Sequence, residues 1–283
     1  MKIKIVTDST SYLPQEYRDE YNIDLVSLNV TFGTESIREM EIDNETFYQR
    51  MAKSPEIPFS SQPTLQELYK AFAEPVQSGA AVVGIFMSSG LSGTYQTALM
   101  VRDMVLEKHP EGVIEVIDSK TTAMEMGFVV LAAAKAAQAG QALAGVLDQA
   151  WQVMKKTRFL FTPEVLEYLR KGGRIGGAQA LLGALLQIKP ILTVLEGKAA
   201  VFDKVRTKGR ALEEMIRVFL EDVKAKGLGE IVVHHINNEH DGMKLVAMIE
   251  KSLGIKASIL PIGPVVGLHV GPGTVGLAYY TAV

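Results

Sequence analysis

Three apolar segments in the first half of the chain each end in a short run of acidic and hydroxyl residues that opens a helical segment. They are residues 2–7 followed by Asp8-Ser9-Thr10-Ser11, residues 80–87 followed by residues 88–94, and residues 113–117 followed by Asp118-Ser119. Strands that alternate with helices in this way form a mainly parallel sheet with helices on its faces. Ligands bind such sheets at the carboxyl ends of the strands. The pattern therefore predicts an α/β fold whose functional residues lie at these corners.

The second half of the chain has a different texture. Residues 172–177 are dense in glycine, and short apolar segments follow them.

Hydrophobic periodicity along the whole chain indicates further elements. We predict helices at residues 124–139, 143–156, 163–171, 178–187, 211–226 and 241–253. We predict strands at residues 24–32, 158–162, 189–195, 199–202, 231–235, 257–260, 265–270 and 275–280.

Chain length indicates how these elements are organised. A chain of 283 residues is close to the limit for one hydrophobic core. We therefore predict two α/β lobes with a ligand between them. The N-terminal lobe, residues 1–156, would have a mainly parallel sheet with flanking helices. The C-terminal lobe, residues 157–283, would be mixed α/β.

Composition excludes several classes of protein. Hydrophobic residues make up 47% of the chain and charged residues 22%, as in ordinary globular proteins. The net charge is −3 and the basic residues are scattered, so we expect no nucleic acid partner. The longest apolar run, residues 175–188, is shorter than the roughly 20 residues that cross a bilayer. Because the apolar start is too short for a secretory signal and the chain has no Cys, we expect a cytoplasmic location.

Residues 88–94 are the most informative candidate site. They combine four hydroxyl residues and two glycines where a helix begins, so backbone N–H groups and the helix dipole would face an anion. No Lys follows the glycines as in a Walker loop, and Ser92 lacks the second Gly of a Gly-x-Ser-x-Gly elbow. A capped turn whose hydroxyls satisfy their own backbone remains the alternative.

Two other segments could join this site. Ser60-Ser61-Gln62 also precedes a helix start, and in a parallel sheet it could lie beside residues 88–94. Residues 263–273 surround a single histidine, His269, with apolar residues and Gly-Pro turns. A histidine in an apolar strand is either a satisfied core residue or a binding residue.

We predict no metal site. Neighbouring residues of a strand point to opposite faces, so His234 and His235 are poorly placed to share an ion with His240. Asp8 and Asp118 could bind magnesium beside a phosphate, but each is explained by capping of the turn that follows it.

Six motifs, in this order, carry a resemblance to a known family. They are Thr7-Asp8-Ser9-Thr10-Ser11, Ser60-Ser61-Gln62-Pro63, Ser88-Ser89-Gly90-Leu91-Ser92-Gly93-Thr94-Tyr95-Gln96, Val116-Ile117-Asp118-Ser119, Leu169-Arg170-Lys171-Gly172-Gly173-Arg174-Ile175 and the segment from Gly263 to Gly273. Over essentially its whole length, the chain resembles the DegV family.

This resemblance implies a bacterial, cytoplasmic, two-lobed α/β protein that binds a long-chain fatty acid between its lobes. It also implies a partner, a separate ATP-dependent fatty acid kinase that phosphorylates the carboxylate of the bound lipid. The protein would then have no catalytic residues, cofactor or metal of its own and at most transient contact with a membrane. The competing function is a stand-alone enzyme acting on a phosphorylated small molecule at residues 88–94, since that loop suits phosphate as well as carboxylate.

The resemblance also implies roles for individual residues. The family binds the carboxylate through residues that correspond to Ser60, Ser92 and His269, and we include their neighbours Ser61, Gly93 and Thr94. The chain has Ser60 where the family usually has Thr, which keeps the hydroxyl but loses a methyl group. It has Tyr12 where an Asp is usual.

Two arginines match family positions associated with the kinase. Arg174 and Arg206 would contact the acyl-phosphate or an acidic surface of the partner, so Arg174→Ala should leave lipid binding intact and abolish phosphorylation. We further expect the small residues of the predicted helix at 178–187 to line the acyl tunnel. A Gly183→Trp substitution would then shorten the acyl chains that the protein accepts.

Overall fold

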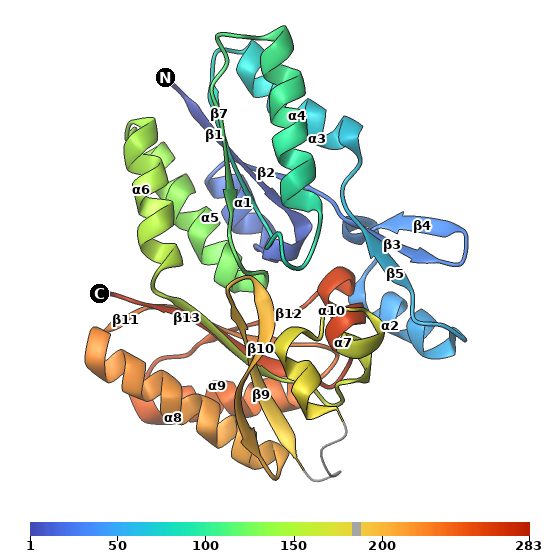
Figure 1. The fold of residues 1–283 in the computed structure, drawn as a ribbon. Helices are drawn as coiled ribbons and strands as arrows, with labels where there is room; N and C mark the ends of the chain where they lie inside the picture. The colour runs from blue at the N-terminus through green and yellow to red at the C-terminus, as the bar shows by residue number, and fades with distance from the viewer. Residues whose placement is uncertain (183–187) are drawn as a thin grey trace.

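The computed structural model describes residues 1–182 and 188–283, which form two large β-sheets, a small third sheet and the helices around them (Figure 1). The two large sheets lie toward opposite ends of the molecule (Figure 1). This architecture confirms the predicted α/β class. Among the described residues, no helix is long and apolar enough to cross a membrane.

The first large sheet is parallel and has the strand order β2-β1-β6-β7. Its strands are β1 (Ile3–Asp8), β2 (Ile23–Val26), β6 (Ala81–Phe86) and β7 (Ile114–Asp118). One face packs against α3 (Leu65–Gln77) and α4 (Thr94–Lys108). A short helix, α1 (Gln15–Glu20), connects β1 to β2. Parallel pairing brings the hydroxyl-rich turns after β1, β6 and β7 to one edge, as the strand-and-turn pattern predicts.

Helix α5 (Ala123–Gln138) joins the two large sheets. It contacts β1 and β6 of the parallel sheet and β8 and β13 of the second large sheet. Twelve of its residues are buried, many of them alanines whose small side chains allow close approach on both sides. Helix α6 (Leu143–Met154) packs beside it. The division of the chain at residue 156 stays a prediction, because α5 belongs to both cores.

The second large sheet is mixed, with the order β10-β9-β8-β13-β11-β12. Only β11 and β12 pair in parallel. The strands are β8 (Thr157–Thr162), β9 (Lys189–Leu195), β10 (Lys198–Val205), β11 (Leu228–His235), β12 (Ser258–Pro261) and β13 (Val275–Thr281). Helices α8 (Lys208–Lys226) and α9 (Glu239–Leu253) cover one face. The β9–β10 hairpin packs against Gly176–Leu181, and Gly197 in its turn accepts a hydrogen bond from Ser88 in the loop after β6.

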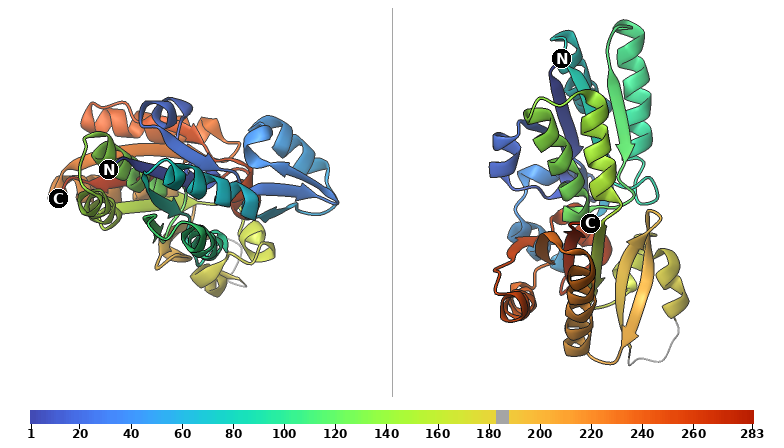
Figure 2. Two further views of the ribbon diagram at one scale, coloured as in Figure 1. Left: turned by 90° about the horizontal axis from the view of Figure 1, so that it is seen from above. Right: turned by 90° about the vertical axis from the view of Figure 1, so that its left-hand side faces the viewer.

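The predicted strand at 24–32 is wrong in one respect, because the structure divides it. Residues 23–26 form β2, whereas β3 (Asn29–Phe32) pairs with β4 (Glu35–Arg38) and β5 (Phe59–Ser61) in a separate antiparallel sheet. Ser27 and Leu28 between them are buried, so polarity does not reveal the break. This small sheet and α2 (Asn44–Lys53) project to one side of the molecule (Figures 1 and 2).

The predicted strand at 265–270 is also wrong, because Pro264–Val270 is a helix, α10. A short run of apolar residues fits a buried strand and a buried helix equally well. The flanking residues favour the helix. Pro264 occupies the first turn, where a backbone N–H has no partner within the helix, and Gly271 ends the helix with a φ of 93°. Six of the seven residues of α10 are buried.

The region around the glycine-rich segment differs from expectation as well. Helix α7 (Glu167–Lys171) begins four residues after Pro163, and Gly176–Leu181 is a 3₁₀ helix, η3. Two other 3₁₀ turns, η1 (Ser9–Ser11) and η2 (Glu39–Glu41), lie near the N-terminus. The predicted α-helix at 178–187 is therefore wrong for residues 178–181. Its remaining part, including Gly183, lies outside the described residues apart from Leu182.

Candidate functional site

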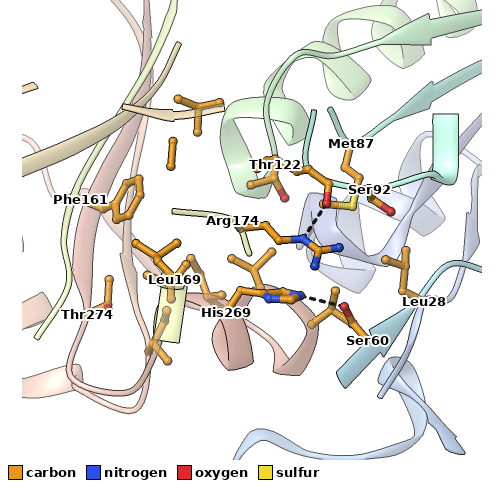
Figure 3. Close-up of a pocket in the computed structure, with 18 of the residues that line it drawn as sticks. Leu28, Ser60, Met87, Ser92, Thr122, Phe161, Leu169, Arg174, His269 and Thr274 are labelled. Carbon is orange, nitrogen blue, oxygen red and sulfur yellow. Dashed lines mark hydrogen bonds between the residues drawn. The ribbon is translucent and has the colours of Figure 1, made fainter. Parts of the chain in front are cut away.

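A cavity of about 350 Å³ lies where the two large sheets, the small sheet and α10 meet. Most of its wall is aliphatic or aromatic, with a few hydroxyl, amide, imidazole and guanidinium groups. It is lined by Leu28, Ser60, Ser61, Gln62, Met87, Leu91, Ser92, Gly93, Thr122, Phe159, Phe161, Leu169, Arg174, Val194, Ala199, Ile236, Ile262, Val265, Val266, His269, Val270 and Thr274. The groups of Ser60, Ser92, Arg174 and His269 lie near one another, away from Phe161 and Thr274 (Figure 3).

Ser60 and His269 meet at this polar end. Ser60 lies on β5 and pairs with Val30 of β3, while His269 comes from α10. The hydroxyl Oγ of Ser60 and the imidazole Nε2 of His269 are hydrogen-bonded at 2.9 Å. Burial, with the charge of Arg174 as a second cause, lowers the pKa of His269 to about 4. His269 is therefore neutral at pH 7 and carries one N–H donor.

The other ring nitrogen of His269 lies against Gly172. Nδ1 is buried and has no hydrogen-bond partner among residues 1–182 and 188–283. A Cβ atom on Gly172 would overlap Nδ1, so the first glycine of Gly172-Gly173 leaves room for the imidazole. The backbone φ of Gly172 is −73°, which any residue adopts. Glycine is required here by space and not by conformation.

Ser92 and Gly93 reach the cavity from the loop between β6 and α4. The Ser92 hydroxyl is 2.9 Å from Oγ1 of Thr94 and accepts the Thr94 N–H at 3.3 Å. Because α4 begins at Thr94, the positive end of its dipole lies at this loop. Thr94 itself is fully buried and does not line the cavity.

The loop of residues 60–62 abuts this one. A Cβ on Gly93 would lie 2.8 Å from Oε1 of Gln62, so the two segments are in contact. The sequence predicted that they lie side by side, although Ser60 and Ser61 belong to a strand and not to a free loop. The hydroxyls of Ser60, Ser61 and Ser92 thus line one cavity.

Arg174 and Arg206 lie far apart. Arg174 lines the cavity, where its Nε donates to the carbonyl of Leu91 at 3.1 Å and its Nη1 donates to the carbonyl of Gly172 at 2.7 Å. Arg206 is exposed and follows β10. It lies seven residues along the chain from Ala199 of the cavity wall, about 23 Å in an extended strand. Only Arg174 is part of the cavity.

The apolar end of the cavity comes mainly from residues that the sequence did not single out. Phe159 and Phe161 of β8, Val194 of β9 and Ala199 of β10 belong to the apolar lining, and Phe161 lies away from the polar groups (Figure 3). None of the described residues 178–182 lines the cavity. The wall residues carry no sequence signal beyond strand periodicity, which explains why they were not predicted.

Three of the groups considered for metal binding, those of His234, Asp8 and Asp118, make other contacts. His234 accepts the N–H of Met124 at its Nε2 and contacts the carbonyl of Leu260 through Nδ1, and burial lowers its pKa to about 4. Asp8 accepts the N–H groups of Thr10 and Met87, and Asp118 accepts that of Lys120. Within residues 1–182 and 188–283, no cluster of three or more candidate ligands is placed to hold a metal.

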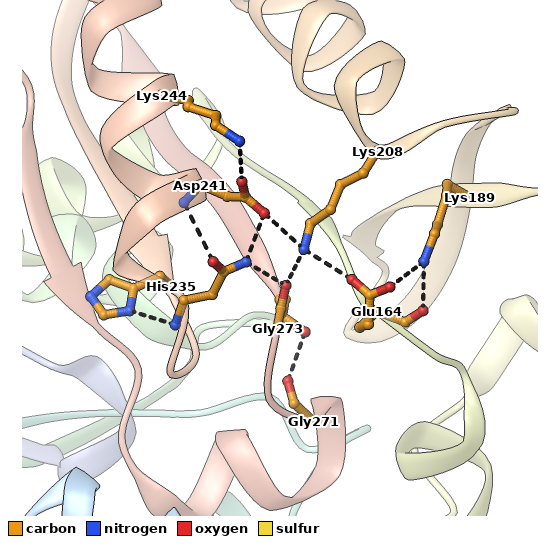
Figure 4. A network of polar contacts seen from close by, with 10 residues as sticks. Glu164, Lys189, Lys208, His235, Asp241, Lys244, Gly271 and Gly273 are labelled. Carbon is orange, nitrogen blue, oxygen red and sulfur yellow. Dashed lines mark hydrogen bonds and ion pairs between the residues drawn. The ribbon is translucent and has the colours of Figure 1, made fainter.

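The turn that follows α10 is held by a polar network (Figure 4). Nζ of Lys208 donates to the carbonyl of Gly273 at 2.7 Å and pairs with Glu164 and Asp241 at 2.9 and 3.0 Å. The side-chain amide of Asn238 donates to the same carbonyl at 2.9 Å. These contacts fix the turn between His269 and Thr274 of the cavity wall.

Comparison with known proteins agrees with this architecture. The model of the family described as "Uncharacterised protein, DegV family" matches residues 2–282. A DegV domain-containing protein of Clostridium acetobutylicum is 49% identical over 281 residues, which cover 99% of this chain and 98% of that protein.

Two solved structures share the fold over nearly the whole chain. DegV of Bacillus subtilis, described as a fatty acid binding protein, has a TM-score of 0.89 and 32% identity, with 99% of each chain covered. A fatty acid (stearic acid)-binding protein of Eubacterium ventriosum has a TM-score of 0.90 and 27% identity, with 99% of this chain and 98% of that chain covered. On this family match and these similarities, the chain belongs to the DegV family.

Proposed function

We propose that this protein binds a long-chain fatty acid in the cavity, with the carboxylate at Ser60, Ser92 and His269 and the acyl chain along the apolar wall. The observation that carries the proposal is one mainly apolar cavity in which the polar groups of Ser60, Ser92, Arg174 and His269 lie together (Figure 3). Two solved relatives that share the fold are described as fatty acid binding proteins.

The polar end suits a carboxylate. A carboxylate that leaves water must regain hydrogen bonds to charged or dipolar donors. The hydroxyls of Ser60 and Ser92, the single N–H of neutral His269 and the N-terminus of α4 are such donors. The guanidinium of Arg174 adds a positive charge at the same end.

The apolar end accounts for affinity. Burial of an acyl chain of about sixteen carbons contributes at most about 12 kcal/mol, at roughly 0.8 kcal/mol per CH₂ and before the costs of ordering and desolvation. A phosphorylated small molecule has little apolar surface to bury against such a wall. The competing enzyme function is therefore less well supported.

The proposal extends to a partner. We infer that the bound lipid is presented, in the cytoplasm, to an ATP-dependent fatty acid kinase that forms the acyl-phosphate. Arg174 is half-buried at the polar end, where it would face the transferred phosphate. Because Arg174 also lines the cavity, we now expect Arg174→Ala to weaken lipid binding as well as phosphorylation. Arg206→Ala is the variant expected to affect the partner step alone.

Native mass spectrometry of the purified protein, followed by extraction and identification of any lipid, tests the binding proposal. We expect one fatty acid per chain and at least tenfold weaker binding in the Ser60→Ala/Ser92→Ala double variant. Ser89→Ala is the matched control, because Ser89 lies in the same loop but does not line the cavity. A protein that is free of lipid and takes up neither palmitate nor oleate would contradict the proposal and favour the phosphorylated-substrate enzyme.

A further inference from the structure

The N-terminus of α10 is capped by residues from the opposite end of the chain. Its own capping position is Gly263, which has no side chain, and Pro264 has no N–H. The next two N–H groups are accepted by Glu39 and Tyr12. Val265 donates to Oε1 of Glu39 at 2.9 Å, and Val266 donates to the Tyr12 hydroxyl at 3.2 Å. The partners are 226 and 254 residues apart in sequence.

Glu39 accepts two further hydrogen bonds. The hydroxyl of Tyr12 donates to its Oε1 at 3.1 Å, and the hydroxyl of Ser9 donates to its Oε2. Its carboxyl group therefore accepts three hydrogen bonds, one of them from a backbone N–H of α10. We call Glu39, Tyr12 and Ser9 the α10 clamp.

No positive charge balances the α10 clamp. Glu39 is 5% exposed and makes no ion pair among the described residues. The titratable groups that face it are Asp8 from β1, Tyr12 and Tyr48 from α2. Burial, with a smaller contribution from the charge of Asp8, raises the pKa of Glu39 to about 7. Both its protonated and its ionised form are then populated near neutral pH.

Two glycines allow close contact with the α10 clamp and with Tyr48 beside it. A Cβ on Gly263 would lie 2.7 Å from the Tyr12 ring and 2.8 Å from Oε1 of Glu39, and one on Gly267 would overlap the Tyr48 hydroxyl. Tyr12 has a φ of 48°, a left-handed conformation that is unusual for an aromatic residue. Such strain persists only where surrounding contacts hold it.

We propose that Glu39 is a positioning residue: with Tyr12 it holds α10 so that His269 meets Ser60 at the head-group end of the cavity, and fatty acid affinity depends on its ionisation. This inference rests on the proposed function. An ionised carboxylate forms a charge-assisted bond with the Val265 N–H, and protonation weakens that bond. The fatty acid should bind more tightly when Glu39 is ionised, and by reciprocity its binding should lower the pKa of Glu39.

The clamp can be tested first without any lipid. The chain has five His residues, so the His269 ring signal can be assigned in an NMR spectrum with a His269→Gln variant. We expect the amide signal of Val265 and the ring signal of His269 to show a shared titration step near pH 7 in the unmodified protein. Glu39→Gln should remove the step from both signals.

Glu125→Gln is the matched control. Glu125 is also a buried glutamate whose pKa burial raises to about 7, but it lies on α5 and bonds to Thr121. The step should persist in this variant. A His269 signal without a step near pH 7 in the unmodified protein, or a step that survives Glu39→Gln, would overturn the inference.

Lipid affinity is measured separately with cis-parinaric acid, a fluorescent C18 fatty acid, between pH 6 and pH 8. We expect affinity to rise about tenfold over this range relative to Glu39→Gln, as for one charge-assisted hydrogen bond. The probe's own titration cancels in this ratio. A ratio that does not change with pH would contradict the proposed dependence. If no variant binds the probe at any pH, the proposed function fails, while the NMR signals still decide whether the clamp exists.

Discussion

The two ends of α10 are held by polar clusters of opposite character. At the N-terminus, the α10 clamp is buried and has no cation, and its acid has a raised pKa. At the C-terminal turn, the carbonyl of Gly273 is held by Lys208 and Asn238 in a half-exposed network of ion pairs (Figure 4). There, hydrogen bonds and charge interactions with Lys244, Asn238 and Lys208 lower the pKa of Asp241 despite its burial.

This difference determines whether each set of contacts responds to pH or to salt concentration. A buried carboxylate without a cation responds to pH near neutrality but is shielded from salt. An ion-paired network near the surface responds to salt, but its carboxylates stay ionised through the neutral range. The contacts that hold the N-terminus of α10 therefore depend on pH, and the contacts that hold its C-terminal turn depend on ionic strength.

The largest expected effect is that of Glu39→Ala. The substitution leaves the Ser9 hydroxyl and the Val265 N–H without their acceptor, and it leaves the Tyr12 hydroxyl only the carbonyl of Gly263 at 3.4 Å. Each buried donor that loses its acceptor costs about 1–3 kcal/mol. We expect the free energy of unfolding to fall by about 4 kcal/mol in urea denaturation at pH 5, where the carboxyl group of Glu39 is still protonated in the folded protein. If Glu39→Ala lowers the free energy of unfolding no more than Lys208→Met does, the buried end of α10 is not the more costly one to disrupt.

The second effect is the pH dependence of stability. Since the pKa of Glu39 rises from 4.5 in the unfolded chain to about 7 in the folded protein, the folded state binds more protons in that window. The contribution of Glu39 to stability is present below about pH 4.5 and is lost as the pH rises through 7. At roughly 1.36 kcal/mol per pKa unit, the loss is about 3.4 kcal/mol.

This effect is measured as the difference in unfolding free energy between the unmodified protein and Glu39→Gln. The difference should fall between pH 5 and pH 7.5 and be constant above pH 8. His234 and His269, whose pKa values are lowered to about 4, make stability rise with pH up to 6.5, but they cancel in the difference. A constant difference across the range would show that Glu39 does not titrate there.

The third effect lies at the C-terminal end of α10, at the imidazole itself. Gly172→Ala places a methyl group where Nδ1 of His269 now lies and should displace the ring from Ser60. We expect fatty acid affinity to fall about tenfold, or 1.4 kcal/mol. Gly209→Ala is the control, because a Cβ there has nothing within 4 Å. Equal affinity in both variants would argue against a role of His269 at the head group.

The smallest effect is that of Lys208→Met. The side chain of Lys208 is 23% exposed and pairs with Glu164 and Asp241, so its loss should cost about 1 kcal/mol of unfolding free energy. The cost should shrink between 0.05 M and 0.5 M NaCl, whereas that of Glu39→Ala should not. If the cost of Glu39→Ala depends on salt and the cost of Lys208→Met does not, the contrast between the two ends of α10 is wrong.

Much of the architecture could be predicted from local pattern. The turns after β1, β6 and β7 gather at one edge as the alternation of strands and helices indicated. Ser60, Ser92 and His269 were selected through resemblance to a family, and all three line the cavity. Their roles at a carboxylate stay predictions.

Other parts left no usable signal in the sequence. Glu39 sits in the segment Arg38-Glu39-Met40-Glu41, which looks like an exposed charged turn, yet its side chain is buried. Arg174 was expected to contact the acyl-phosphate or an acidic surface of the partner, and that role stays a prediction, while its place in the cavity wall was not foreseen. The run at 265–270 was assigned to a strand because its periodicity does not distinguish a short buried helix from a strand.

By itself, the sequence determined the class of the fold, the parallel pairing in its first half and the polar turns that follow those strands. Periodicity and turn chemistry are properties of consecutive residues, so they can be read before the chain is folded. Only the tertiary structure decided that His269 meets Ser60 across 209 residues and that Glu39 caps α10 across 226. Burial and hydrogen-bond partners depend on which layers pack together, and that packing also sets how each group ionises.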